Sequence, residues 1–323
     1  MNPSTRWDCL CVGLAVADHI CRPISHLPKA GELVLAEKLE LATGGCAANA
    51  AVDLARLGVN VGIVARVGDD IFGEFVRREM QRQSVETSGL ITTPDYETSG
   101  TLIVNVKRED RRFIHCFGAN AALDGSELTT HELRDTRVLY LGGYFAAPKL
   151  TPGAVVRWFE QCRSAGVATL LDVVIPGPGD YAAPLKTILP HTDVFLPNTD
   201  EAKVMTGFDA PLDQARCFRD WGAKSVIITC GGEGTVVLTQ TEQFRAGVFH
   251  VEHIDGTGSG DAFDAGFIYG LLQGGDLRRC VELGSALGAS AVRKIGATAG
   301  VFTPDELDDF LARNQLTFEP ISA

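Results

Sequence analysis

Short apolar runs alternate with stretches of helical periodicity along most of the chain, and this alternation restricts the fold more than any other feature. Residues 9–16 (CLCVGLAV) predict a buried strand, and residues 47–58 (AANAAVDLARLG) predict a helix that ends in glycine. Residues 60–68 and 71–83 repeat this strand–helix pair. Such alternation is typical of a largely parallel sheet with helices on both faces. The pattern continues with strands expected at 137–143, 167–174, 193–198 and 225–232, and helices at 152–165, 182–189, 199–206, 210–221 and 261–273.

Two parts of the chain depart from this alternation. Residues 33–41, 99–107 and 111–117 are rich in strand-forming residues, and a charged turn (REDR, 108–111) joins the last two. We expect antiparallel strands here, outside the central sheet, in a small β-lid inserted at about 15–43 and 97–118. Since no linker rich in Pro, Gly or Ser and no internal repeat interrupts the chain, residues 1–323 are expected to form a single domain.

Composition restricts the partners. The net charge of −12 repels nucleic acid and anionic membranes, so we expect neither as a partner. No apolar window reaches the roughly 20 residues that cross a bilayer. The apolar stretch near the N-terminus lacks a basic segment before it and predicts a strand, not a signal peptide, which favours a cytoplasmic protein. Nine cysteines without a metal-binding spacing are expected to be reduced and packed as small hydrophobes.

A glycine-rich loop at residues 255–261 (DGTGSGD) leads directly into the helix expected at 261–273. A dinucleotide fingerprint would need a third glycine where Asp261 stands, and that acid would repel a pyrophosphate. No Gly-Lys-Ser or Gly-Lys-Thr of a P-loop occurs, and no set of spaced oxygen ligands marks a calcium loop. Backbone N–H groups of Gly258, Ser259 and Gly260 can instead converge on an anion at a helix start. Asp261 is then either a helix-start acid or a general base beside a phosphoryl group.

Five segments, in order along the chain, resemble the ribokinase-like (PfkB) family of carbohydrate and nucleoside kinases. The loop and its helix (DGTGSGDAFDAGFI) resemble the C-terminal signature of the family, and residues 44–58 (GGCAANAAVDLARLG) its N-terminal signature. Residues 118–120 (GAN), 196–207 (LPNTDEAKVMTG) and 228–234 (ITCGGEG) match further landmarks. The resemblance implies an α/β fold, a three-layer α/β/α sandwich with a mainly parallel central sheet and a small β-sheet lid. It also implies an ATP-dependent kinase that phosphorylates a primary hydroxyl of a sugar.

The resemblance implies roles for residues around the phosphates. Asp261 would be the catalytic base, with Gly258, Ser259 and Gly260 as the anion hole. Asn198 and Glu201 would order Mg²⁺ and the phosphates, although a helix cap explains the same pair. The remaining candidates are the metal ligands Glu201 and Asp255, and the ATP contacts Thr229, Gly231 and Gly234. A monovalent cation such as K⁺ is a further candidate cofactor.

The acceptor would lie near the carboxyl end of the first strand, where parallel sheets bind ligands. Asp18 follows that strand and can accept two hydrogen bonds from neighbouring sugar hydroxyls. By resemblance, the acceptor loop contains Gly44, Gly45 and Asn49, with Asn120 at the edge of the lid. Asn49 has an alternative role as a buried polar residue that caps its own helix.

Departures from the family pattern leave the acceptor open. Cys46 stands where many ribokinases have Lys, and Gly142 and Gly143 stand where they place an acid. Tyr144 and Phe145 follow and either stack on a ligand or pack under the sheet edge. A nucleoside kinase is therefore the nearest alternative, and a dinucleotide-dependent oxidoreductase and a non-catalytic sensor are more distant ones. The lid also predicts a homodimer, since its apolar strands need a cover, whereas a monomer would favour the nucleoside alternative.

Overall fold

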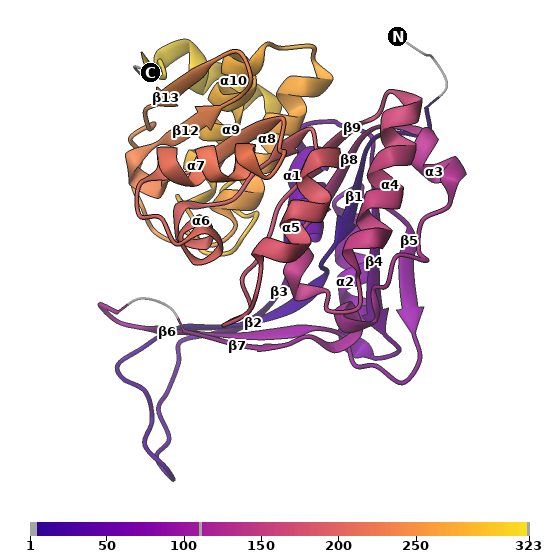
Figure 1. Cartoon of the computed structure of the whole chain (residues 1–323). Coiled ribbons are helices and arrows are strands. Elements are labelled where there is room, and N and C mark those ends of the chain that lie inside the picture. The colour runs from indigo at the N-terminus through magenta and orange to yellow at the C-terminus, as the bar shows by residue number, and fades with distance from the viewer. Residues whose placement is uncertain (1–4, 110–111, 322–323) are drawn as a thin grey trace.

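The central element of the computed structural model, which describes residues 5–109 and 112–321, is a long twisted sheet (Figure 1). Within these residues ten strands pair in the order β14-β13-β12-β11-β10-β9-β8-β1-β4-β5, parallel from β11 to β5 and antiparallel at the β12–β14 edge. The strands are β1 (Trp7–Gly13), β4 (Val61–Gly68), β5 (Glu86–Thr93), β8 (Thr136–Gly142), β9 (Ala168–Leu171), β10 (Val194–Phe195), β11 (Ser225–Thr229), β12 (Thr235–Leu238), β13 (Gln243–Ala246) and β14 (Phe318–Pro320). The mainly parallel sheet is as predicted.

Helices cover both faces of this sheet and bury two hydrophobic cores. One core contains residues of α1 (Cys46–Arg56), α2 (Ile71–Arg82), α8 (Ser259–Leu272), α9 (Leu277–Ala291) and α10 (Pro304–Arg313). The other contains residues of α3 (Thr130–Arg134), α4 (Pro152–Ala165), α5 (Ala182–Ile188), α6 (Thr199–Thr206) and α7 (Pro211–Asp220). Alternate residues of β1 enter the two cores, Cys9 and Cys11 on one side and Leu10 and Val12 on the other. The predicted three-layer α/β/α sandwich is thus confirmed.

A second sheet forms the predicted lid. In the described part of the chain its four strands pair in the order β3-β2-β6-β7, from β2 (Val16–Ile24), β3 (Leu39–Gly44), β6 (Gly100–Val106) and β7 (Arg112–Cys116). Figure 1 shows this sheet lying beneath the main body, with the loop between β2 and β3 extending away from it. The lid joins the body where β3 leads into α1, and the start of β2 pairs with the end of β3 at that point.

Several sequence expectations about the lid need correction. The first strand ends at Gly13, not at residue 16, so Asp18 lies within lid strand β2. The predicted strand at 33–41 is wrong over most of its length, because β3 begins only at Leu39. One further backbone bond, from the Arg22 N–H to Lys38 O at 3.0 Å, extends the pairing with β2 beyond Leu39. The strands are also not all antiparallel, because β2 and β6 run parallel.

Other differences concern helices and strands that no strong sequence pattern predicted. No element was expected from the sequence at α3, α9, α10, β5, β12, β13 or β14. The four strands complete the two edges of the sheet, and α9 and α10 complete the helical layer beside α8. The expected charged turn at 108–111 lies partly outside the described residues. Among the described residues, no helix is both long and apolar enough to cross a membrane.

Candidate active site

Asp261 lies in the first turn of α8, directly after the glycine loop. The helix N-cap is Gly258, whose φ of 75° is left-handed and whose missing Cβ avoids a collision with Ala297. Beyond it Gly260 faces open space, with no atom within 4 Å of the position a Cβ would take. The N-terminal N–H groups of a helix have no partner within the helix. The loop can therefore hold an anion against the start of α8, as the sequence predicts.

The Asp261 carboxylate is half-buried and hydrogen-bonded to α1. Asn49 Nδ2 donates to Asp261 Oδ2 at 2.7 Å, and the Cys46 thiol also donates to this carboxylate. Burial raises the pKa of Asp261 above its ordinary value, while the bonds from Asn49 and Cys46 oppose the rise. A raised pKa suits a group that must accept a proton near neutral pH.

Asn49 does not cap its own helix. The N-cap of α1 is Gly45, and no side chain accepts a hydrogen bond there, so the capping alternative is wrong. The carbonyl oxygen of the amide, Oδ1, is buried and has no hydrogen-bond partner among the described residues. Because burying an unpaired polar group is unfavourable, this atom is well placed to accept a hydrogen bond from a ligand.

Asp18 approaches this centre from the lid. It lies on β2, is only 8% exposed, and receives a hydrogen bond from Thr101 of β6. Gly44 pairs across the lid, and a Cβ at that position would collide with the Asp18 carboxylate. Burial raises the pKa of Asp18 to about 6, the bond from Thr101 opposes the rise, and the charge of Asp261 adds to it. The predicted acceptor residues Asp18, Gly44, Gly45 and Asn49 thus lie around the start of α1.

Asn120 is also buried near the lid. Its Oδ1 accepts a hydrogen bond from the backbone N–H of Ala15 at 3.3 Å. Its amide nitrogen, Nδ2, is buried without a partner among the described residues. A free donor on Asn120 and a free acceptor on Asn49 are the two buried amide groups that a polyhydroxy ligand could satisfy.

A cavity of about 560 Å³ opens on the other side of the glycine loop. Its walls include six of the predicted nucleotide and phosphate residues and a largely apolar segment from the end of β13 onward. The predicted residues are Asn198, Thr229, Gly231, Gly234 and the loop pair Ser259 and Gly260, and the apolar segment includes Val248, Phe249 and Val251. The volume and mixed lining suit a nucleotide with an apolar base pocket and a polar phosphate end.

Asn198 and Glu201 form the start of α6. Asn198 Oδ1 accepts bonds from the N–H groups of Asp200 and Glu201, and Glu201 Oε2 accepts from the Asn198 N–H, a complete capping box. The capping alternative is therefore confirmed, yet both side chains also line a cavity. Burial raises the pKa of Glu201 to about 7, against the bond from the Asn198 backbone. Carboxylate and amide oxygens are ligands that fit Mg²⁺.

Asp255 lies apart from these residues. Its Oδ1 accepts bonds from Thr257, and its Oδ2 accepts from the Gly296 N–H at 3.0 Å. Asp255 lines neither cavity, whereas Glu201 lines the smaller one. The structure thus separates the two predicted metal ligands, and Asp255 acts locally to hold the glycine loop against the segment after α9.

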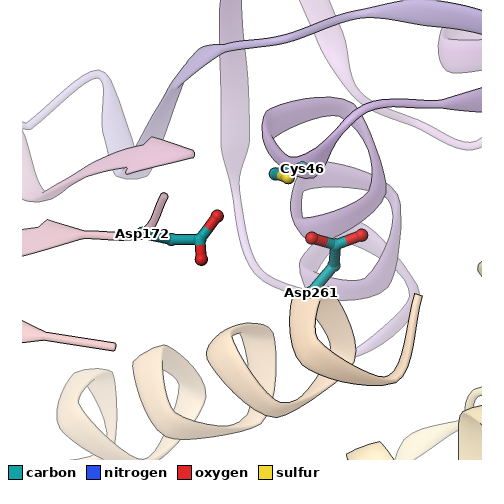
Figure 2. A group of neighbouring side chains, drawn as sticks. All are labelled: Cys46, Asp172 and Asp261. Atoms are coloured by element: carbon teal, nitrogen blue, oxygen red, sulfur yellow. The ribbon is translucent and has the colours of Figure 1, made fainter. Parts of the chain in front are cut away.

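Two further acids meet Asp261 in a smaller cavity of about 190 Å³. Asp172 follows β9, and its carboxylate, that of Asp261 and the Cys46 sulfur lie within 4.8 Å of one another (Figure 2). Asp264 is one turn after Asp261 and accepts a hydrogen bond from Tyr140 at 2.8 Å. Neither acid was among the residues predicted from the sequence. Asp172 fell inside the strand expected at 167–174, whereas β9 ends at Leu171, so the rule that pointed to Asp18, a position just beyond a strand end, did not reach it.

The aromatic pair Tyr144 and Phe145 packs within the protein. Tyr144 is buried, Phe145 lies against it at 4.8 Å between ring centroids, and Tyr181 packs on Phe145 at 4.7 Å. Of the two alternatives left open by the sequence, packing at the sheet edge is therefore the one observed for Tyr144.

Comparisons with known proteins agree with this geometry. A family model described as pfkB family carbohydrate kinase matches residues 7–304. The chain is 29% identical to the ATP-dependent 6-phosphofructokinase of Thermoanaerobacterium thermosaccharolyticum, over 79% of this chain and 80% of the relative. It is 27% identical to the ribokinase of Haemophilus influenzae, over 93% and 97%. The ribokinase of Arabidopsis thaliana, solved with ribose and ATP, superposes with a TM-score of 0.82 at 22% identity, covering 94% of this chain and 98% of that one.

Proposed function

Because the chain belongs to the pfkB family of carbohydrate kinases, we propose that it transfers the γ-phosphate of ATP to a primary hydroxyl of a small carbohydrate. The observation that carries the proposal is the position of the glycine loop. Gly260 lines both cavities, and Asp261, next to it, lines the smaller one. A nucleotide in the large cavity would thus direct its terminal phosphate toward the carboxylate that activates the acceptor.

Asp261 takes the proton of the acceptor hydroxyl as its oxygen attacks the γ-phosphorus. The Asn49 amide holds Asp261 Oδ2, so the carboxylate keeps one orientation during the transfer. Backbone N–H groups of Gly258, Ser259 and Gly260 and the start of α8 stabilise the charge that develops on the phosphoryl oxygens. ADP leaves with the electrons of the broken β–γ bond, and the proton remains on Asp261 until the product departs.

Asn198 and Glu201 are the proposed residues for Mg²⁺. Bound there, Mg²⁺ would neutralise phosphate charge, which matters because no Lys or Arg of the described residues lines either cavity. We also propose that Asp255 binds a cation, as the sequence predicts. Its position behind the glycine loop favours a monovalent cation such as K⁺ over the Mg²⁺ that accompanies ATP.

The acceptor is proposed to lie between the lid and the start of α1, held by Asp18, Gly44, Gly45, Asn49 and Asn120. We further propose that residues 1–323 act as one kinase domain in the cytoplasm, dimerised through the lid. A nucleoside acceptor stays the alternative within the same fold. Against it, the aromatic ring of Tyr144 is buried among the side chains of the core, which leaves it little surface on which a base could stack.

An ADP-release screen over pentoses, hexoses, keto-deoxy acids, phosphosugars and nucleosides tests the proposal. We expect turnover that requires ATP, Mg²⁺ and one class of sugar. Turnover of nucleosides alone would favour the alternative. If the protein bound ATP and sugars without ever releasing ADP, it would be a sensor and the proposal would be wrong.

A further inference from the structure

The turn that follows β8 carries no side chain into the acceptor region. A Cβ on Gly142 would lie 2.9 Å from the Ala47 backbone nitrogen at the start of α1. Real Cβ contacts are essentially never that short, so β8 can approach α1 only because residue 142 is glycine. An acceptor group that lies beside this turn must therefore be held by a side chain from a neighbouring strand.

Asp172, at the end of the adjacent strand β9, supplies such a side chain. Its backbone N–H donates to Leu141 O at 2.9 Å, which extends the parallel pairing of β8 and β9. Its Oδ2 accepts a hydrogen bond from the Gly143 N–H at 3.0 Å. These two bonds hold the carboxylate in the turn after β8, and Figure 2 shows it pointing toward Asp261 at the start of α8.

The other oxygen of this carboxylate, Oδ1, has no hydrogen-bond partner among the described residues. Asp172 is 9% exposed and lines the smaller cavity with Asp261 and Cys46. The three side chains could surround a metal ion, but Mg²⁺ prefers oxygen ligands and a thiol is a poor one. A sugar hydroxyl suits this free oxygen better, because it can donate to Asp172 while its neighbour donates to Asp261.

We propose that Asp172 binds the acceptor, its Oδ1 accepting a hydrogen bond from a second hydroxyl next to the one that Asp261 deprotonates. The inference rests on the proposed kinase function and deepens it. It names the acceptor class as an uncharged polyhydroxy compound. Within the described residues, the cavity that Asp172 lines contains three other acids, Glu201, Asp261 and Asp264, and no Lys, Arg or His. A phosphate or carboxylate on the acceptor would therefore be buried beside acids without a counter-charge.

The variant Asp172→Asn tests the contact. Asparagine can still accept the bond from the Gly143 N–H, but it then presents an NH₂ donor where the acceptor hydroxyl needs an oxygen. We expect the acceptor KM to rise roughly 10- to 100-fold, the effect of losing a hydrogen bond to a charged group. The KM for ATP and the half-saturating Mg²⁺ concentration should stay within about twofold. Asp213→Asn, at an exposed ion pair with Arg216 on α7, is the matched control and should change none of them.

A deoxy analogue of the best acceptor tests the same contact without a mutation. For the wild-type enzyme, the acceptor KM should rise by a similar factor when the neighbouring hydroxyl is absent. For Asp172→Asn, the same analogue should raise the KM little further, since the two changes remove one interaction. The measurement on the wild-type enzyme tests the contact even if the variant fails to fold. If removing each ring hydroxyl in turn left the acceptor KM of the wild-type enzyme unchanged, the assignment would be overturned.

Other outcomes separate this inference from the proposed function. A rise in half-saturating Mg²⁺ with unchanged acceptor KM would make Asp172 a metal residue and overturn the inference. A higher kcat/KM for a phosphosugar or sugar acid than for its uncharged counterpart would overturn the acceptor class. If the wild-type enzyme released no ADP with any acceptor, the kinase proposal itself would fail and this inference with it.

Discussion

Asn49 Nδ2 donates a hydrogen bond to Asp261 Oδ2 at 2.7 Å, and so joins two residues that are 212 positions apart. The bond connects the start of α1, which follows the lid, to the start of α8, which follows the glycine loop. The acceptor side and the phosphate side of the site are therefore joined by this hydrogen bond. A substitution at one of the two residues should alter the properties of the other.

The first prediction concerns the base. Asp261→Asn keeps the size of the side chain and removes the group that accepts the proton, so kcat should fall by roughly 10² or more. Binding of ATP and of the acceptor, measured by calorimetry, should change little. A variant that kept more than about a tenth of the wild-type kcat would remove Asp261 from the role of base.

The second prediction concerns the acceptor. Asp18→Ala removes a buried carboxylate from the lid, and the acceptor KM should rise by roughly tenfold or more, since charge-assisted hydrogen bonds are lost. The KM for ATP should change much less, because the nucleotide cavity has no contribution from Asp18. Steady-state kinetics with each substrate varied in turn make the comparison. Equal effects on both KM values would indicate a structural role for Asp18.

The third prediction uses the amide that orients the base. The hydrogen bond from Asn49 lowers the pKa of Asp261, so its removal in Asn49→Leu should raise that pKa. The acidic limb of the kcat–pH profile should then move to higher pH, and kcat near neutral pH should fall. A profile with unchanged shape and a lower plateau would show that Asn49 does not act through the Asp261 carboxylate.

The fourth prediction concerns pH and stability at Asp18. Its pKa in the folded protein is about 6, above the ordinary value of 3.8, so the folded state holds the proton more tightly than the unfolded state. This contribution to stability is present below about pH 3.8 and is lost as the pH rises through about 6. Asp18→Asn should therefore have a higher Tm than the wild-type protein at pH 7 to 8, with the difference shrinking at pH 4 to 5. A Tm difference that does not depend on pH would contradict the assigned pKa.

The fifth prediction concerns the lid. Leu102 on β6 and Ile114 on β7 face each other across the strand pair and are 42% and 67% exposed, so this face of the lid presents a solvent-exposed apolar patch. We expect a homodimer that covers this patch, with Ile114→Glu shifting it toward monomer. Val204→Glu, on the exposed side of α6, is the control. Light scattering at micromolar concentration measures the mass, and a wild-type value near 34.5 kDa would rule the dimer out and favour a nucleoside acceptor.

The sequence by itself determined the layered architecture and the position of the glycine loop. The bounds expected for α4 and α6 agree with the structure because local chemistry marks them. Thr151 caps α4 before a proline at its first position, and a capping box begins α6 at Asn198. The anion-binding arrangement of the loop at 255–261 could likewise be predicted, because the residues that supply the helix-start N–H groups and the adjacent acid are consecutive in the chain.

Only the tertiary structure decided which distant acids meet. Asp172 joins Asp261 because β9 lies beside β8 and α8 packs against α1, and sheet order is set by crossovers that no local pattern encodes. The pairing of β2 with β6 likewise joins two separate insertions, which moved Asp18 from a strand end into the lid. Local hydrogen bonding determines where a helix begins. The contacts that close a site between elements depend instead on long-range packing, because each requires two segments whose separation in sequence carries no information about their distance in space.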